Sequence, residues 1–229
     1  MGEEEQRDEW RDAEDQAEEV LHFWFSGEFE HKYRRRWFAK PGSEQQKRVD
    51  SEIVRRFLPL VSLAADEGAL LSWEETPRTR LALIIVLDQL VRHTHRDHPD
   101  AAGIIEQCGR DALDLSEDLL ERGWDVTLTA EERVFAAMPL RHHPTVARLE
   151  KVLSKVEEWS KSEIDPVALE LLSRFKRTSL TRLLRLKDAQ RFDGDILERE
   201  EVEVLASAEA HLVSQEICNF FNIHPPPVP

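Results

Sequence analysis

The chain has 229 residues, of which 41% are hydrophobic and 34% charged, so it can bury a substantial core and is too apolar to be disordered as a whole. Its formal net charge of −15 disfavours general binding to nucleic acid or to an anionic membrane surface. Two cysteines without a C-x-x-C pair, no apolar run long enough to cross a bilayer and no signal peptide predict a reduced, cytoplasmic protein.

Helical periodicity runs through almost the whole chain after an acidic segment, residues 1–15, that we expect to be mobile. The apolar run "RLALIIV" lies in a helix opened by Thr76 and Pro77, and we expect this helix to be central and buried. The short run "DVTLT" is the only β-like stretch. Apolar spacing and cap signals predict a first helix with acidic first turns that residues 17–25 close, and further helices over the ranges 43–65, 76–93, 101–122, 129–138, 144–161, 165–183 and 195–221.

Short connections between consecutive helices are typical of antiparallel helical hairpins. The sequence therefore predicts an all-α protein in which residues 16–222 form one domain, a helical array of about seven or eight antiparallel helices. Residues 223–229 form a Pro-rich tail.

Four motifs occur in order along the chain, "VLHFWF", "WFAKPG", "LALIIVLDQLVR" and "GWDVTLTAEERVFAAMPLRHH". Together they make residues 20–190 resemble the uncharacterised proteins of domain-of-unknown-function family 924. The resemblance implies a tetratricopeptide-like helical array and no established activity. It matches Asp88, Gln89 and Arg92 to the family's D-Q and R, and His142 to the His of E-H-S-E.

The chain departs from the family pattern at several polar positions. His93 replaces an Asn, and the neighbours of the matched His142 are Arg141 and His143 where Glu and Ser are expected. In the last family motif, Phe175 and Arg177 match the start, whereas residues 179–182, "SLTR", replace the final P-H-R-N. The chain thus keeps about half of the family's polar residues, which lowers the expectation of a working active site.

The polar end of the apolar helix contains residues for two possible sites, a metal site at its histidines and a ligand site at Asp88 and Arg92. His93, His95 and His98 are spaced two and three residues apart across a helix end, whereas metal ligands on one helix converge at i, i+4. We therefore predict no metal and no cofactor, and expect these histidines nearer solvent. Asp88 is costly in an apolar helix unless paired, and Arg92 is its natural i, i+4 partner.

Two interpretations of Asp88 stay open. It forms a structural buried ion pair, or it orients a ligand while Arg92 binds an anion. The candidate ligand pocket consists of Asp88, Gln89, Arg92 and His142. We assign no catalytic residue, since no hydrolase elbow, P-loop or dinucleotide fingerprint occurs.

The stretch from Arg174 to Arg191 is basic within an acidic chain. Arg174, Arg177 and Arg185 fall broadly on one side of a helix and form a candidate anion-binding face, which the acidic N-terminal segment is expected to weaken. A solvated basic face without a function is the alternative interpretation.

Two functional classes follow. The first is a non-enzymatic helical binding or scaffold module for a protein partner, and the second is binding or processing of a small anionic metabolite in the candidate pocket. Complete burial of the pocket residues as a paired network favours the first class, and a deep, water-accessible polar cavity favours the second. We expect neither a membrane nor nucleic acid as the partner.

Overall fold

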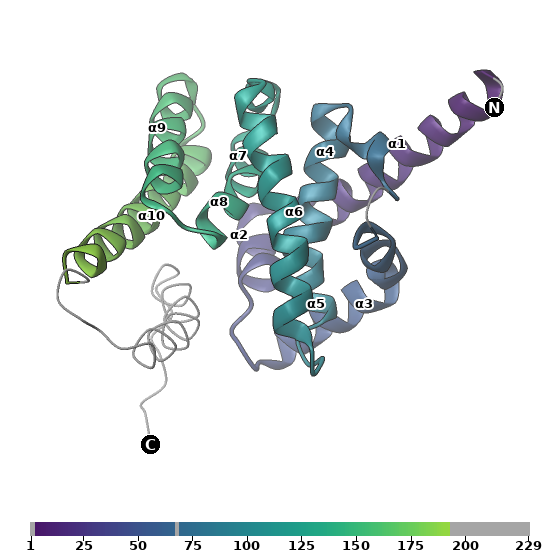
Figure 1. Ribbon diagram of the computed structural model, residues 1–229, viewed down its shortest axis with the longest axis horizontal. Coiled ribbons are helices and arrows are strands. Elements are labelled where there is room, and N and C mark those ends of the chain that lie inside the picture. The colour runs from purple at the N-terminus through teal and green to yellow at the C-terminus, as the bar shows by residue number, and fades with distance from the viewer. Residues whose placement is uncertain (1–2, 67–68, 193–229) are drawn as a thin grey trace.

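A computed structural model describes residues 3–66 and 69–192, and every regular element in that part of the chain is helical (Figure 1). The all-α, single-domain prediction is confirmed. The elements follow in the order α1 (Glu3–Phe25), α2 (Phe29–Lys32), a π-helical turn η1 (Tyr33–Trp37), α3 (Glu44–Ala64), a 3-10 turn η2 (Leu71–Glu74), α4 (Pro77–Ile84), a π-helical turn η3 (Ile85–Leu90), α5 (Val91–Thr94), α6 (Ala101–Glu121), a 3-10 turn η4 (Trp124–Thr127), α7 (Ala130–Ala136), α8 (Met138–His142), α9 (Val146–Ser162) and α10 (Pro166–Phe192).

The predicted helix starts are confirmed where a side chain caps the helix. Ser43 Oγ accepts a hydrogen bond from the backbone N–H of Gln46 at 3.2 Å, and Thr76 does the same for Thr79. Thr129 forms a complete capping box at the start of α7. Each such cap satisfies a backbone donor that the first helical turn leaves free.

Some predicted boundaries differ from the structure. Helix α9 begins at Val146, because Thr145 rather than Pro144 takes the cap position. The β-like run "DVTLT" forms the turn η4 instead. The predicted helix 195–221 and the Pro-rich tail lie outside the described residues. The acidic N-terminus is helical from Glu3 and extends away from the other helices in Figure 1, while its mobility stays a prediction.

The array has three parts in Figure 1, with the α9–α10 pair at one end, α4, α6 and α7 in the middle, and α1 and α3 at the other end. The expected central helix is confirmed, since every residue from Leu81 to Leu87 is buried. Aromatic side chains fill the space beside it, with Trp24 and Trp37 both packed against Phe135. None of the described helices has the length and apolarity needed to cross a membrane.

A buried carboxylate that the sequence did not reveal joins η4 to α9. Asp125 is fully buried, and its Oδ2 accepts hydrogen bonds from Trp159 Nε1 at 2.7 Å and from Lys155 Nζ at 3.2 Å. An indole N–H and an ammonium group together compensate the cost of burying this charge. This segment of the "GWDVTLT" motif therefore has a structural role.

Candidate functional site

The centre of the predicted pocket, Asp88, lies on the π-helical turn η3 between α4 and α5. Such turns are rare in proteins as a whole, and those that occur are often found at functional sites. The Asp88 side chain is 0% exposed. A carboxylate in this position is stable only if its oxygens are fully hydrogen-bonded.

The structure brings all four predicted pocket residues together around this carboxylate. Asp88 Oδ1 accepts a hydrogen bond from His142 Nδ1 at 2.7 Å and another from Arg92 Nη2 at 3.2 Å. Its Oδ2 accepts from Gln89 Nε2 at 2.5 Å. Arg92 Nε also donates to the Asp88 carbonyl at 2.8 Å. Both carboxylate oxygens are thus satisfied within this Asp88 network.

Burial and charge act in opposite directions on the two titratable groups of the Asp88 network. Burial alone would raise the pKa of Asp88, but His142, Arg92 and Gln89 outweigh it and hold that pKa well below its usual range. Burial, together with the charges of Arg92 and Arg141, lowers the pKa of His142 to about 4 against the opposing effect of Asp88. His142 is therefore neutral near pH 7, when Arg92 already balances the Asp88 charge.

The Asp88 network is largely closed to ligands. The Arg92 and His142 side chains are 34% and 20% exposed, whereas Asp88 is enclosed. A ligand at this place meets Arg92 and one edge of His142, and it reaches the carboxylate only if an existing hydrogen bond breaks. The network joins the central helix to α8, so its first effect is on stability.

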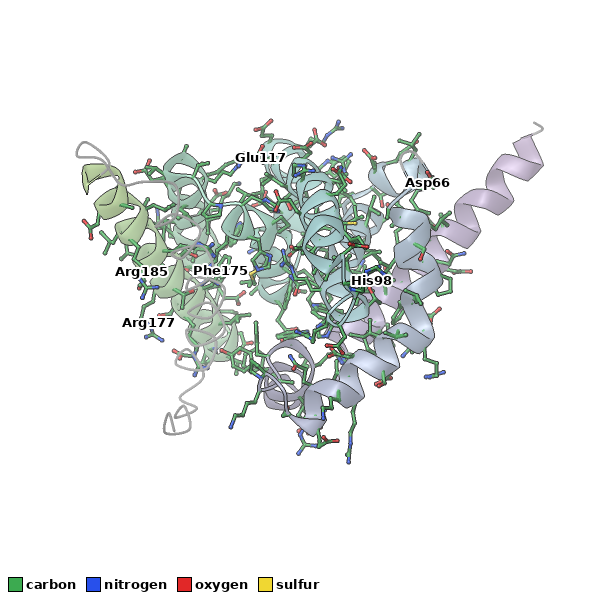
Figure 2. The ribbon with its side chains drawn as sticks, turned by 60° about the horizontal axis from the view of Figure 1, so that its bottom comes forward. Asp66, His98, Glu117, Phe175, Arg177 and Arg185 are labelled. Carbon is green, nitrogen blue, oxygen red and sulfur yellow. The ribbon has the colours of Figure 1, made fainter. Side chains whose placement is uncertain are left out.

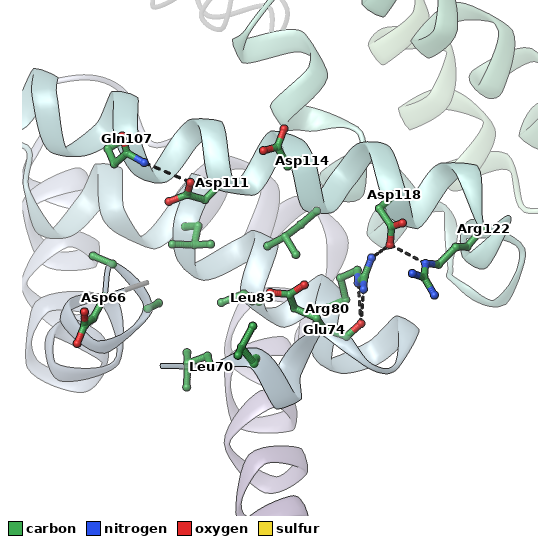
Figure 3. Close-up of a pocket in the computed structure, with 15 residues that line it drawn as sticks. Asp66, Leu70, Glu74, Arg80, Leu83, Gln107, Asp111, Asp114, Asp118 and Arg122 are labelled. Atoms are coloured by element: carbon green, nitrogen blue, oxygen red, sulfur yellow. Dashed lines mark hydrogen bonds and ion pairs between the residues drawn. The ribbon is translucent and has the colours of Figure 1, made fainter. Parts of the chain in front are cut away.

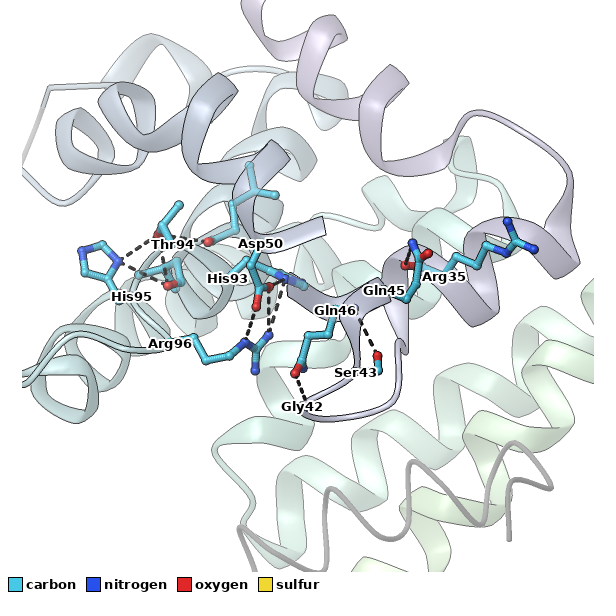
Figure 4. A network of polar contacts seen from close by, with 12 residues as sticks. Arg35, Gly42, Ser43, Gln45, Gln46, Asp50, His93, Thr94, His95 and Arg96 are labelled. Carbon is cyan, nitrogen blue, oxygen red and sulfur yellow. Dashed lines mark hydrogen bonds and ion pairs between the residues drawn. The ribbon is translucent and has the colours of Figure 1, made fainter. Parts of the chain in front are cut away.

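The prediction that His93 lies near solvent is wrong. Its side chain is only 10% exposed, and its Nδ1 lies 2.6 Å from Oδ1 of Asp50 in α3. The Asp50 carboxylate also accepts a hydrogen bond from Arg96 (Figure 4). The ring packs edge-on against Trp24. A carboxylate and an aromatic face from distant segments thus bury His93 where local sequence shows only a helix end.

The other two histidines of the stretch lie further out. His95 is half-buried and contacts Thr94 Oγ1 at 2.9 Å, and His98 is exposed. Within residues 3–66 and 69–192, no three His, Cys, Asp or Glu side chains gather as a metal site.

The candidate anion-binding face on α10 is not one cluster. Arg174 is engaged by Glu170 at 2.5 Å and by the Tyr33 hydroxyl at 3.2 Å. Figure 2 shows Arg177 and Arg185 on the side of α10 that faces away from the central helices. Binding of an anion there stays a prediction.

The structure also contains a groove that the sequence did not reveal, which we call the α6 groove (Figure 3). It has a volume of about 850 Å³. It lies between α6 on one side and the end of α3 with η2 on the other, over a floor from α4 and η3. Its lining includes Asp66, Leu70, Leu71, Glu74, Arg80, Leu83, Leu87, Gln107, Asp111, Asp114, Leu115, Asp118 and Arg122.

The charges of the α6 groove are unbalanced. Asp118 binds both Arg80 and Arg122, which are the two bases of the lining. The side-chain carboxylates of Asp66 and Asp114, which line this groove, make no hydrogen bond or ion pair with any described residue. The spacing of Asp111, Asp114 and Asp118 along one face of α6 was the available sequence signal, but a solvated acidic face gives the same pattern.

Comparisons with known proteins agree with this fold. The profile of the family described as "Bacterial protein of unknown function (DUF924)" matches residues 20–212. No curated protein matches the sequence. A solved structure, a protein of unknown function (ATU0120) from Agrobacterium tumefaciens, is similar with a TM-score of 0.55 and 20% identity, over 83% of this chain and 97% of that one. At that identity the likeness shows the fold alone.

The Asp88 network predicts which substitutions destabilise the protein. Asp88→Ala leaves Arg92 without its carboxylate partner, so we expect the free energy of unfolding to fall by about 3–5 kcal/mol. Asp88→Asn keeps the shape and should cost less. His95→Ala, on the same stretch, should cost about 0.5 kcal/mol or less. Urea melts of the three variants measure these losses, and equal small losses for both alanine variants would show that Asp88 is no structural anchor.

The lowered pKa of His142 predicts a loss of stability as the pH falls. Unfolding restores its ordinary pKa of about 6.5. Below that pH the unfolded state binds more protons than the folded state, so the free energy of unfolding falls. Asp88 adds no pH dependence between pH 7 and 5, because its pKa in the unfolded state is about 3.9 and it is ionised in both states. His142→Asn keeps a donor for Asp88 and does not titrate. Urea melts at pH 7 and pH 5 measure how far the free energy of unfolding falls between the two. This fall should be smaller by about 1–2 kcal/mol in His142→Asn than in the unchanged protein. An equal fall in both proteins would show that His142 does not have a lowered pKa.

Proposed function

We propose that this chain, which belongs to the DUF924 family of bacterial proteins of unknown function, is a non-enzymatic helical module that binds a partner protein in its α6 groove. The single observation that carries the proposal is the contrast between the two polar regions. The Asp88 network is closed on itself, and the α6 groove is open with unpartnered carboxylates.

The closed state of the Asp88 network argues against a catalytic role for it. A catalytic carboxylate must come within hydrogen-bond reach of its substrate. Asp88 is 0% exposed, and each of its oxygens already has a donor. Its contacts instead support a rigid array, on which a surface groove keeps its shape.

The α6 groove has the properties of an interaction surface. Its volume of about 850 Å³ falls within the range of ligand sites. Leu71 on its wall is 63% exposed, so the groove offers an apolar side chain beside carboxylates that have no partner among the described residues. This combination supports a macromolecular partner, because protein interfaces combine apolar and polar contacts.

Site-specific photocross-linking in cells of the source organism tests the proposal. The photoreactive amino acid replaces Leu71 in one protein and Val126 in the other, and these side chains are 63% and 64% exposed. We expect one discrete adduct from position 71, lost when Asp66 and Asp114 are both changed to Asn. Equal adducts from both positions, or none from position 71, would contradict a partner in the α6 groove.

A second candidate function is the binding of a small anion at Arg92 and His142. The observation that favours it is their partial exposure beside a network that already fixes their orientation. A pre-oriented guanidinium binds phosphate or carboxylate groups well.

Titration with inorganic phosphate, followed by the imidazole NMR signals, tests this second candidate. A specific site predicts a saturable shift of the His142 signals, with little change at exposed His98. The shift should disappear in Arg92→Gln, while Arg96→Gln serves as the control because Arg96 binds Asp50. Parallel shifts of both histidines would indicate nonspecific anion effects and would exclude the site.

A further inference from the structure

The shape of the α6 groove limits what it can bind. Its α6 wall runs from Gln107 to Arg122 through residues spaced by three or four, so these side chains share one face of the helix. Fifteen residues of helix span about 22 Å. The α6 wall is therefore straight and long enough for roughly four turns of a second helix laid along it.

The charges that line the α6 groove limit the chemistry of the partner. Five acids, Asp66, Glu74, Asp111, Asp114 and Asp118, stand on its walls. Arg80 and Arg122 both form ion pairs with Asp118, and Arg80 also donates a hydrogen bond to the Glu74 carbonyl. Both bases are therefore occupied, and the remaining carboxylates repel an anionic ligand. A cationic partner gains from both walls at once.

The α6 groove also has an apolar component. Leu83, Leu87 and Leu115 form its nearly buried base, and Leu71 stands exposed on the wall opposite α6. Leucine between carboxylates matches a helix that carries apolar residues on one stripe and bases on its flanks.

We propose that the occupant of the α6 groove is a basic amphipathic helix of a partner protein, with a leucine-like stripe on the groove and lysine or arginine on either side. This inference rests on the proposed function and adds the chemistry of the partner. The bases of that helix meet Asp114 on the α6 wall and Asp66 on the wall opposite, the two carboxylates without a partner among the described residues.

A synthetic helical peptide of about 15 residues, with leucine on one face and lysine on the other, is the basic probe. Its twin with glutamate in place of lysine is the acidic probe. Fluorescence anisotropy with the full chain should show saturable binding of the basic probe, weakened as salt rises. The acidic probe should bind at least about tenfold more weakly.

Matched variants locate the binding. Asp66→Asn with Asp114→Asn should weaken the basic probe about tenfold or more. Asp97→Asn with Asp188→Asn removes the same charge at exposed positions outside the groove and should have little effect. Leu71→Ser should weaken binding and Val126→Ser should not. The exposed Asp66, Asp114 and Leu71 make these variants compatible with folding, which circular dichroism checks.

The outcomes separate this inference from the proposed function. Equal binding of the two probes, or equal effects of the two double variants, overturns the basic helix. If neither probe binds while position 71 still forms its discrete adduct, the basic helix is wrong and the proposed function stands. Sedimentation velocity tests a second copy as the occupant. Self-association that Asp66→Asn with Asp114→Asn abolishes would overturn the proposal in favour of that copy.

Discussion

The buried carboxylate of Asp88 is the constraint on which the centre of the array depends. An ionised group inside the central helix is tolerated only while His142, Arg92 and Gln89 hold it. His142 ends α8, so the need to satisfy Asp88 fixes where α8 lies. The next residue, His143, comes so close to α6 that a Cβ at Gly109 would lie 2.5 Å from its Nε2. One charge thus sets the spacing of three helices.

The features that the sequence predicted are local ones. Helix starts at Ser43 and Thr76 depend on contacts within one turn, and the pairing of Asp88 with Arg92 follows from i, i+4 spacing. His142 joined the candidate pocket only through the resemblance to family motifs. The burial of His93 was not predictable, because its partner Asp50 lies 43 residues away on another helix. The α6 groove is assembled from several distant segments, and its one local signal, the acidic face of α6, is also typical of a solvated helix face.

The departures from the family pattern can be interpreted physically. Asp88, Gln89, Arg92 and His142 match the family, and in the structure they bond to one another. Two substituted positions, His143 and Ser179, carry a buried side-chain atom without a hydrogen-bond partner among the described residues. The four matched residues of the Asp88 network therefore satisfy one another, as expected if the network stabilises the fold. Trp24 in the matched motif "VLHFWF" also has a buried Nε1 without a hydrogen-bond partner among the described residues. Unsatisfied buried groups, which cost stability, therefore occur at matched and substituted positions alike.

The central helix carries both Asp88 and part of the base of the α6 groove. The stability of the Asp88 network is therefore linked to the proposed binding in the groove. Leu83 and Leu87 form part of the groove base, and Asp88 follows Leu87 on the π-helical turn. Consecutive residues on a helix point in different directions, so one side of the central helix forms the groove while the next is tied to α8. A base held in this way does not need to be ordered when a partner arrives, so less of the interaction free energy is lost on binding. Under the proposed function, the buried charge of Asp88 thereby favours binding without contacting the partner.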